Sequence, residues 1–537
     1  MARGGGHLAC AGSHRRSGTA ARRYPTRRQA NGRGPAEAQL SASAARLPTY
    51  TSTGAPLTPS RVVPSGLGVA GDGAVTASSH PCKARVAVPC HRVGVVSTRT
   101  RQDQTAAEPS LGAARLAGWG RALDLLVSAL LPPRDGIARL TLRHALSTLA
   151  LLVLLPIGLA YHWLGFALDE ILFRGYRRLP VRAPLFILGV PRSGTTALHH
   201  LLAHDPRLTT MRTWECLFAP AISWRYLWRG IARLDARLGS PGAWLVNRAA
   251  SRLSRGLEGV HPIGLDAPEE DYLALLPRLS CFILVVAFPD APGLWRLGRG
   301  DHGLTGPERR RLMAAYRRCI QRHLYFHGGH RRYLAKNAAF APLAGSLLEA
   351  FPDARVIACL REPAGALSSQ LASLDPALSS LHGPYRRDVL RERMISQLGL
   401  GYDTLLEQLP RLPAGRAVLL PLPAQRRGLA AAVRACYREL GLPLAPPLKN
   451  RLAAADAAAR HHRSGHRHQL AHWNLDAASV RHRFADVTAL LDLTGEYAVP
   501  AHRLPSRPPQ PPRDHHGIAV ITPAPARRHR LGCRAGA

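Results

Sequence analysis

Acidic side chains are scarce in this sequence, and the scarcity is greatest near its beginning. The chain has 537 residues, with 34 Asp and Glu against 72 Lys and Arg, and a formal net charge of +38. The first 100 residues hold only two acids, Glu37 and Asp72, and are dense in Gly, Ala, Ser, Thr and Pro. Such a composition offers too little apolar surface to offset the entropy of ordering the chain. We therefore expect residues 1–110 to be a disordered basic extension.

The end of the chain has a similar character. Residues 501–537 contain the run RPPQPPRDHH and are basic and rich in proline, so we expect a disordered tail there. Neither end interleaves aromatic residues with its arginines, as a groove for single-stranded nucleic acid requires. We therefore expect no nucleic-acid partner. With both ends expected to be disordered, we place the folded domain at residues 183–500.

Paired cysteines are also missing. The nine cysteines form no Cys-x-x-Cys pair and are odd in number. This pattern argues against a disulfide framework and against a zinc site, and it suits a reducing compartment. The N-terminal residues also lack a continuous apolar run of signal-peptide length. We expect the chain to lie on the cytoplasmic side of a membrane or in the cytoplasm.

One long segment has no charged side chain. No Asp, Glu, Lys or Arg occurs across the 24 positions of 145–168, which is long enough to cross a bilayer as a helix. Pro156, Gly158 and His162 interrupt the segment, and arginines flank both ends, so the positive-inside rule gives no orientation. A single membrane span, a helix in the membrane plane and a buried soluble helix all remain open. Residues 111–182 are accordingly expected to form a hydrophobic helical segment with membrane contact through 145–168.

The most informative stretch is FILGVPRSGTTALHHLL, residues 186–202. A short apolar run typical of a buried parallel strand leads through a glycine turn into Leu198, Leu201 and Leu202, which recur at helical spacing. Backbone N–H groups at the start of such a helix form a cradle for anions. Thr195 stands where a P-loop nucleotide triphosphatase has its lysine, so ATP hydrolysis is disfavoured. Arg192, inside the turn, supplies the cation instead.

The sequence GVPRSGTT resembles the 5′-phosphosulfate-binding loop of sulfotransferases that use 3′-phosphoadenosine 5′-phosphosulfate (PAPS). It is most similar to the tyrosylprotein sulfotransferases and to the bacterial family with Pro-Arg-Ser-Gly-Thr-Thr. The resemblance implies a three-layer, P-loop-like α/β fold in which a mostly parallel central sheet is flanked by helices. It also implies that Arg192, Ser193, Gly194, Thr195 and Thr196 bind the cofactor.

The resemblance implies a second signature, in which an arginine at the end of a strand and a serine eight residues later bind the 3′-phosphate. The run ARVIACLREPAGALSS provides Arg361 after an apolar strand, and Ser369 follows at that spacing. The family usually has Arg-Asp-Pro or Arg-Asn-Pro at this turn, whereas this chain has Arg361-Glu362-Pro363. Upstream of this second signature, Lys336 resembles the family's lysine that stabilises the leaving group in sulfuryl transfer.

In the sulfotransferase reaction, the hydroxyl group that accepts the sulfuryl group needs a base to remove its proton. Cytosolic sulfotransferases place a histidine two residues beyond the lysine, but this chain has Ala338 there. The resemblance to tyrosylprotein sulfotransferases favours Glu215, five residues before Pro220. Trp214, Cys216, Leu217 and Phe218 surround it in sequence and could partly desolvate its carboxylate. His199 and the acidic run 269–271 (Glu269, Glu270 and Asp271) remain alternatives.

These features predict a PAPS-dependent sulfotransferase with Glu215, Lys336 and Arg192 as catalytic residues. Its acceptor would be a hydroxyl of a lipid, carbohydrate, small molecule or peptide tyrosine. No metal is expected, because no carboxylate or cysteine shares a consistent spacing with the histidines 461, 462, 466, 468 and 472. The alternatives are a degenerate P-loop nucleotide kinase and a noncatalytic basic protein that binds membranes or nucleic acid.

Overall fold

The computed structural model describes residues 111–254, 264–461, 470–495 and 497–505. The predicted extension 1–110 lies outside the described residues, and so does most of the predicted tail. All described residues belong to one compact unit. Its last described segment is the 3₁₀ turn η8 (Ala501–Arg503), and Leu504 is buried in the core. The ordered chain therefore continues past the predicted boundary at residue 500.

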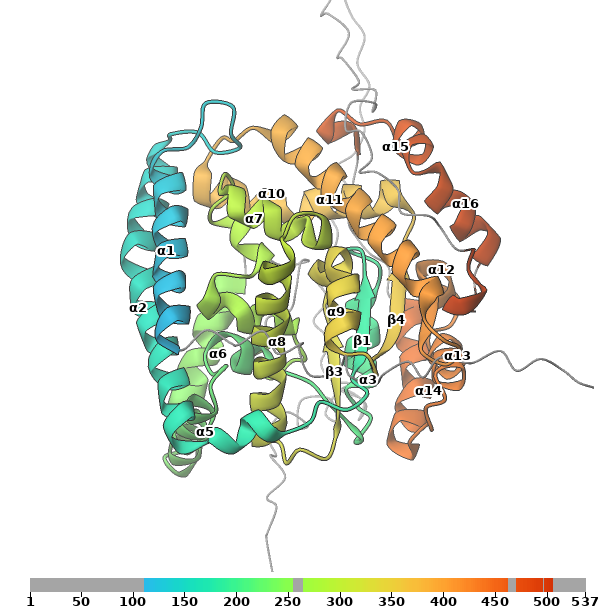
Figure 1. Ribbon diagram of the computed structural model, residues 1–537, viewed down its shortest axis with the longest axis horizontal. Coiled ribbons are helices and arrows are strands. Elements are labelled where there is room, and N and C mark those ends of the chain that lie inside the picture. The colour runs from blue at the N-terminus through green and yellow to red at the C-terminus, as the bar shows by residue number, and fades with distance from the viewer. Residues whose placement is uncertain (1–110, 255–263, 462–469, 496, 506–537) are drawn as a thin grey trace, which may run out of the picture. The chain divides into compact units, whose positions relative to one another are not determined.

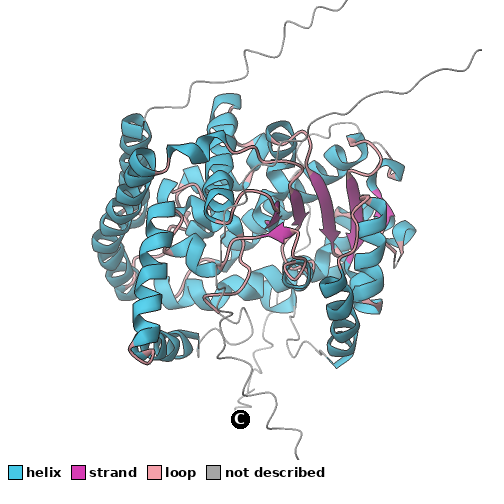
Figure 2. Cartoon of the chain, turned by 90° about the horizontal axis from the view of Figure 1, so that it is seen from below, coloured by secondary structure: helices cyan, strands magenta, loops and turns pink. Residues whose placement is uncertain are grey.

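A six-stranded sheet lies at the centre of the fold, as Figure 2 shows in magenta. Its order is β2-β3-β1-β4-β5-β6, and every pairing is parallel except that of β5 with β6. The strands are β1 (Leu185–Gly189), β2 (Leu208–Thr209), β3 (Arg332–Lys336), β4 (Arg355–Leu360), β5 (Ala417–Pro421) and β6 (Val499–Pro500). The predicted strands before the glycine turn and before Arg361 are both present, and β3 ends at Lys336.

The strands alternate their side chains between two cores. In β1, Phe186 and Leu188 belong to one cluster of buried residues, whereas Leu185 and Ile187 belong to another. This follows from the period of two along a strand, and burial on both faces explains why the run is continuously apolar. The predicted three-layer arrangement with a mostly parallel sheet is confirmed.

Helices cover each face of the sheet (Figure 1). The larger of the two cores contains Phe186 and Leu188 of β1. The helices that pack side chains into it are η2 (Asp271–Arg278), η3 (Phe282–Val286), α8 (Gly306–Phe326), η5 (Ala338–Leu343), α9 (Ala344–Ala350), α10 (Pro363–His382), α11 (Arg387–Gln408), η6 (Leu409–Arg411), η7 (Leu470–Trp473), α15 (Ala477–Arg483) and α16 (Ala485–Thr494). The smaller core receives α3 (Thr195–Leu202), α12 (Leu422–Arg427), α13 (Leu429–Glu439) and α14 (Pro446–His461). Asp476 caps α15, because its carboxylate accepts a hydrogen bond from the Ser479 N–H at 2.7 Å.

A third cluster joins the N-terminal helices to the domain. Helices α1 (Leu111–Leu130) and α2 (Leu142–Leu172) share buried side chains with residues from 219 to 294. The remaining elements of this region are η1 (Arg174–Arg178), α4 (Thr213–Leu217), α5 (Ile222–Arg237), α6 (Pro241–Ser254), α7 (Pro292–Gly298) and η4 (Gly300–His302). The hydrophobic segment 111–182 therefore packs as part of the same unit. Among the described helices, α2 alone is long and apolar enough to cross a membrane.

Candidate active site at the carboxyl edge of the sheet

The turn after β1 depends on two glycines. Gly189 has φ of +154°, and a Cβ there would lie 2.2 Å from the backbone oxygen of Cys359 on β4. Gly194 has φ of +81° and begins α3, where a Cβ would lie 2.5 Å from Oε1 of Gln425. Arg192 also adopts a positive φ, of 67°, which is costly for a residue with a side chain. Such strain concentrates at binding sites, where the surrounding structure holds it in place.

Ser193 lies at the bottom of this turn with an unused hydroxyl. Its side chain is fully buried, and its Oγ has no hydrogen-bond partner among the described residues. The backbone oxygen of Ser193 accepts a hydrogen bond from Nε2 of Gln425 at 3.0 Å, which ties the turn to α12. A buried hydroxyl without a partner is costly. This orphaned hydroxyl, beside the N-terminus of an eight-residue helix, fits the anionic end of a bound nucleotide.

The two predicted halves of the nucleotide site meet directly. Nε of Arg192 donates a hydrogen bond to Oγ of Ser369 at 3.0 Å. Nη1 of Arg361 donates to the backbone oxygen of Arg192 at 3.1 Å. Ser369 is buried on α10, and Arg361 follows directly after β4. Residues far apart in sequence therefore line one site, because the carboxyl ends of β1 and β4 are neighbours in the sheet.

The site holds an excess of positive charge. Burial lowers the pKa of Arg192, and burial together with the nearby charges of Arg426 and Arg192 lowers the pKa of Arg361. Glu362 opposes this effect on Arg361, but its carboxylate also caps α10 by accepting from the N–H groups of Ala364 and Gly365. A bound anion would relieve the repulsion between the arginines.

Arg426 belongs to this site, although sequence reasoning did not find it. The basic run AQRRG, which follows β5, is the signal in the sequence that could have pointed to it. The structure places α12 beside the glycine turn, so Gln425 reaches Ser193 and Arg426 lies close enough to Arg361 to influence its pKa.

Lys336 ends β3 beside the acidic run. Its side chain is almost fully buried and forms an ion pair with Oε1 of Glu270. The Glu270 side chain keeps 20% of its surface exposed, so solvent or an acceptor can reach its carboxylate. Because β1 and β3 are adjacent parallel strands, Lys336 stands at the same edge of the sheet as Arg192.

Asp271, the next residue, is enclosed by hydroxyl groups. The Tyr333 hydroxyl donates to Oδ2 of Asp271 at 2.7 Å, the Tyr316 hydroxyl donates to the same oxygen, and Nδ2 of Asn337 donates to Oδ1 at 3.4 Å. Burial raises the pKa of Asp271 to about 7, against the opposing effect of the two tyrosine hydrogen bonds. This carboxyl group positions the end of β3 and has no exposed surface.

Glu215, the predicted base, lies in a different environment. It is fully buried on α4, and its carboxylate lies 2.7 Å from Nε2 of His327 and 3.5 Å from Nη1 of Arg225. Its Oε2 also accepts from the Arg212 N–H at 2.9 Å as part of a capping box. Although burial alone would raise its pKa, Arg225, His323 and His327 hold the pKa far below its usual range. These contacts argue against a role as base, because the carboxylate is already compensated and has little affinity for a proton.

The location of these partners supports the same conclusion. His323 and His327 lie at the C-terminal end of α8, which leads into the start of β3. Lys336 ends the same strand. The Glu215 carboxylate thus contacts residues that precede β3, whereas Lys336 at the end of that strand pairs with Glu270.

His199, another candidate base, is fully buried on α3. Its Nε2 shares a hydrogen bond of 2.7 Å with Oγ1 of Thr210, and its Nδ1 has no partner among the described residues. Burial holds the pKa of His199 well below its usual value, and the charges of Lys336 and His200 add to this effect. The ring is therefore neutral near pH 7.

One described cluster has the donor set of a metal site. Ligand atoms of Glu215, His323 and His327 all lie within 4.8 Å of one another. Arg225 shares the cluster, however, with Nη1 at 3.2 Å from Nδ1 of His323. The guanidinium already supplies the positive charge and would repel a metal cation. Of the histidines considered in the sequence, 462, 466 and 468 lie outside the described residues.

Comparison with known proteins relates this geometry to a family. Residues 184–446 match the sulfotransferase family. Omega-hydroxy-beta-dihydromenaquinone-9 sulfotransferase Stf3, from Mycobacterium bovis and from Mycobacterium tuberculosis, is 25% identical over 250 residues. These residues cover 44% of this chain and 55% of Stf3. The chain thus matches about half the length of these curated relatives.

Two crystal structures share the fold. Sulfotransferase STF1 from Mycobacterium tuberculosis aligns with a TM-score of 0.53 and 17% identity, covering 71% of this chain and 95% of STF1. STF9 from Mycobacterium avium aligns with a TM-score of 0.53 and 18% identity, covering 74% of this chain and 99% of STF9. At these identities the likeness establishes the fold alone. Together with the family match, it identifies residues 184–446 as a sulfotransferase-family domain.

Proposed function

We propose that this protein transfers the sulfuryl group of PAPS to an acceptor hydroxyl. The observation that carries the proposal is the contact between the two halves of the site, in which Arg192 bonds Ser369 and Arg361 bonds the backbone of Arg192. A nucleotide with anionic groups at both its 5′ and 3′ positions needs two cationic clamps at short range. Few other cellular metabolites combine these two features.

The residues present fit such a nucleotide. Residues 192–196 would hold the 5′-phosphosulfate with the arginine, the orphaned Ser193 hydroxyl and the N–H groups that begin α3. Arg361 and Ser369 would hold the 3′-phosphate, with Arg426 adding charge from α12. Arginine suits both positions because its planar fork binds oxyanions with two parallel hydrogen bonds.

The reaction follows from these positions. The acceptor oxygen forms a bond to sulfur while the bond between sulfur and the bridging phosphate oxygen breaks, and the hydroxyl proton passes to a carboxylate. Negative charge develops on the leaving phosphate oxygen. Lys336 and Arg192, held at the same edge of the sheet, would stabilise that charge, as cationic groups do in phosphoryl transfer.

Glu270 is the base that the contacts favour. Its carboxylate is partly exposed and adjoins Lys336, whereas Glu215 is buried and compensated by Arg225. A positioned carboxylate typically contributes about 10²- to 10⁴-fold to such a step.

The acceptor is proposed to be a hydroxyl on a lipid-like molecule. The curated relatives are named for a hydroxylated dihydromenaquinone, and α2 of this chain is long and strongly apolar. The free thiols of all five described cysteines fit a cytoplasmic location. Carbohydrate, small-molecule and tyrosine acceptors are less consistent with the apolar helix. The kinase and noncatalytic alternatives are disfavoured by the family match and by the missing lysine at Thr195.

Calorimetric titration with adenosine 3′,5′-bisphosphate, ATP and duplex DNA tests the proposal. We expect tight binding of the bisphosphate alone, lost on Arg192→Ala or Arg361→Ala. Arg411→Ala is the matched control, because Arg411 pairs with Glu407 at a half-exposed position. Preferential binding of ATP would favour a kinase, and salt-sensitive binding of DNA alone would favour the noncatalytic alternative.

A further inference from the structure

Helix α2 is apolar on both of its sides. One side is buried in the domain through Leu159, Trp163 and Phe166. The opposite side exposes a stripe at helical spacing, with more than half of each side chain's reference surface open: Leu146 57%, Leu149 58%, Val153 55%, Ile157 61% and Leu164 53%. A helix on the surface of a water-soluble protein normally turns polar residues outward. The outward stripe of α2 therefore requires an apolar environment.

The beginning of α2 is fixed to the domain. Oγ1 of Thr141 donates to the backbone oxygen of His382 at 2.6 Å, and Oγ of Ser147 donates to that of Leu381 at 2.8 Å. The buried His144 ring lies 2.8 Å from the His382 ring, nitrogen to nitrogen. All of these contacts are made to the end of α10.

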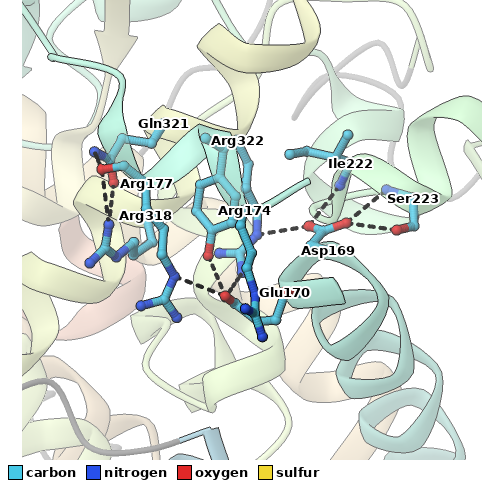
Figure 3. A network of polar contacts seen from close by, with 10 residues as sticks. Asp169, Glu170, Arg174, Arg177, Ile222, Ser223, Arg318, Gln321 and Arg322 are labelled. Carbon is cyan, nitrogen blue, oxygen red and sulfur yellow. Dashed lines mark hydrogen bonds and ion pairs between the residues drawn. The ribbon is translucent and has the colours of Figure 1, made fainter. Parts of the chain in front are cut away.

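The end of α2 is fixed as well (Figure 3). The buried carboxylate of Asp169 accepts hydrogen bonds from the N–H groups of Ile222 and Ser223 at 2.9 and 2.8 Å, and from Nε of Arg322 at 2.8 Å. Glu170 accepts from Nε of Arg177 at 2.8 Å. Because one folded unit holds both ends, α2 cannot cross a bilayer while that unit stays on one side.

Three neighbouring helices extend the apolar stripe. Helices α1 and α5 both pack against α2, and α6 packs against α5; Figure 1 shows these helices together at the left of the view. The exposed apolar residues on these helices, or directly after them, are Trp119, Leu123, Val127, Leu130, Leu131, Leu227, Trp228, Ile231, Leu234, Leu238, Trp244, Leu245 and Val246. We call these residues and the α2 stripe the outer face. Many exposed apolar side chains on neighbouring helices mark an interaction surface.

Charge identifies the partner. Arg229, Arg233 and Arg237 are exposed on α5, and Arg248 lies over the Trp244 ring at 5.4 Å. The single acid of α5, Asp235, is occupied in accepting from the N–H groups of the next helix. A second copy of the chain would bring two arginine-rich faces together, whereas anionic lipid headgroups supply the opposite charge. Tryptophan and arginine beside aliphatic side chains are also typical of helices at a membrane interface.

We propose that the outer face binds the surface of an anionic bilayer, with α2 lying in the plane of one leaflet. This inference does not depend on the reaction proposed above. It selects one of the three interpretations that the sequence left open for residues 145–168.

Flotation with vesicles tests the proposal on the full chain. We compare vesicles of phosphatidylcholine with vesicles that also contain phosphatidylglycerol. The double variant Leu149→Gln/Ile157→Gln should bind the anionic vesicles about tenfold more weakly or worse, because two apolar side chains no longer enter the leaflet. Leu493→Gln is the control, since Leu493 is 84% exposed on α16, away from the outer face. It should bind like the wild type, and all three proteins should share one melting temperature.

Equal binding by the double variant and the wild type would overturn the proposal, since the basic ends of the chain would then account for the adsorption. A dimer in ultracentrifugation that the double variant abolishes, without any vesicle binding, would overturn it in favour of a second copy.

Thiol labelling separates an in-plane helix from a span. Cysteines replace Leu142 and Ile171, which are 76% and 71% exposed near opposite ends of α2. The protein is bound to sealed vesicles and treated with an impermeant maleimide, and labelled peptides are located by mass spectrometry. Because both positions lie on the outward side of α2, similar protection of both by bound vesicles, relative to the free protein, supports the proposal. Protection of one position alone shows a span and overturns it.

Discussion

At the scale of single residues, three carboxyl groups of this domain behave differently because their neighbours differ. Glu270 faces a buried lysine and keeps some exposed surface, and Asp271 is enclosed by tyrosine hydroxyls. Glu215 is paired with a buried arginine. Residue type alone cannot distinguish them, since the environment sets both the pKa and the access of a substrate.

Asp271 should make the stability of the protein depend on pH. Its pKa is raised from an ordinary value of 3.8 to about 7, so the folded form keeps a proton that the unfolded form releases between these values. The free energy of unfolding therefore falls as the pH rises from about 4 to about 7, by roughly 2 kcal/mol or more. In Asp271→Asn the neutral amide removes this titration. Nδ2 of the new side chain can donate to Oδ1 of Asn337, which now has no partner among the described residues.

Thermal unfolding of both proteins from pH 5 to pH 8 measures the effect. The melting temperature of Asp271→Asn relative to the wild type should rise by a few degrees over this range and level off above pH 7. If the melting temperatures of the two proteins changed in parallel with pH, Asp271 would not titrate as described.

Glu270→Gln and Glu215→Gln should fail in different ways. Glu270→Gln should act mainly on turnover: kcat should fall about 10²-fold or more and adenosine 3′,5′-bisphosphate should still bind, with only a small loss of melting temperature, because Glu270 is partly exposed although its partner Lys336 is buried. Glu215→Gln should instead unfold at a lower temperature, because removing one partner of a buried ion pair costs about 3–5 kcal/mol. Calorimetry and a sulfate-transfer assay separate the two. If Glu215→Gln keeps its melting temperature and loses turnover, the base is Glu215 after all.

At the scale of secondary-structure elements, local pattern predicted the elements around the candidate nucleotide site. Strands β1 and β4, the glycine turn and α3 could all be predicted, because burial on both faces of a strand and the helical spacing of leucines leave clear traces in sequence. The position of α12 could not be predicted. It depends on how β5 pairs with β4 and aims the following helix at the turn.

The placement of α12 leads to a prediction about Arg426. Its charge lies near Arg361, so Arg426→Gln should weaken the binding of adenosine 3′,5′-bisphosphate about three- to tenfold, with the larger effect at low salt. Arg427→Gln is the adjacent control, because Arg427 lies over the Tyr497 ring at 4.9 Å. Calorimetry of both variants tests the difference. Equal affinities for the two variants would remove Arg426 from the site.

At the scale of the whole molecule, the N-terminal helices and the sheet domain share one folded unit. The sequence suggested a separate hydrophobic segment at 111–182, because a charge-free run can be a span, an interfacial helix or a buried helix. The structure shows α1 and α2 packed on residues from 219 to 294 through Trp163, Phe166 and their neighbours. Contacts between distant segments decided this, and no local pattern encodes them.

Burial of the thiols gives a test of the whole fold. The described cysteines are free and fully buried, and burial raises the pKa of Cys436 to about 12. All five should therefore react slowly with a thiol reagent in the native protein and rapidly once it is denatured. Peptide mapping after timed labelling identifies Cys216, Cys281, Cys319, Cys359 and Cys436 individually. Fast native labelling at any of them would show that this part of the core is open.

The sequence by itself determined the class of fold and the strand, glycine turn and helix around Arg192. Each depends on residues close together in the chain, where steric demands on glycine and the periods of strand and helix are direct.

Only the tertiary structure decided which carboxylate faces Lys336, why Glu215 is compensated, and that α2 is held at both ends. Burial, ion pairing and the field of neighbouring charges arise between residues separated in sequence, such as Glu270 and Lys336, 66 residues apart, or Thr141 and His382, 241 residues apart. They exist only once the chain has folded.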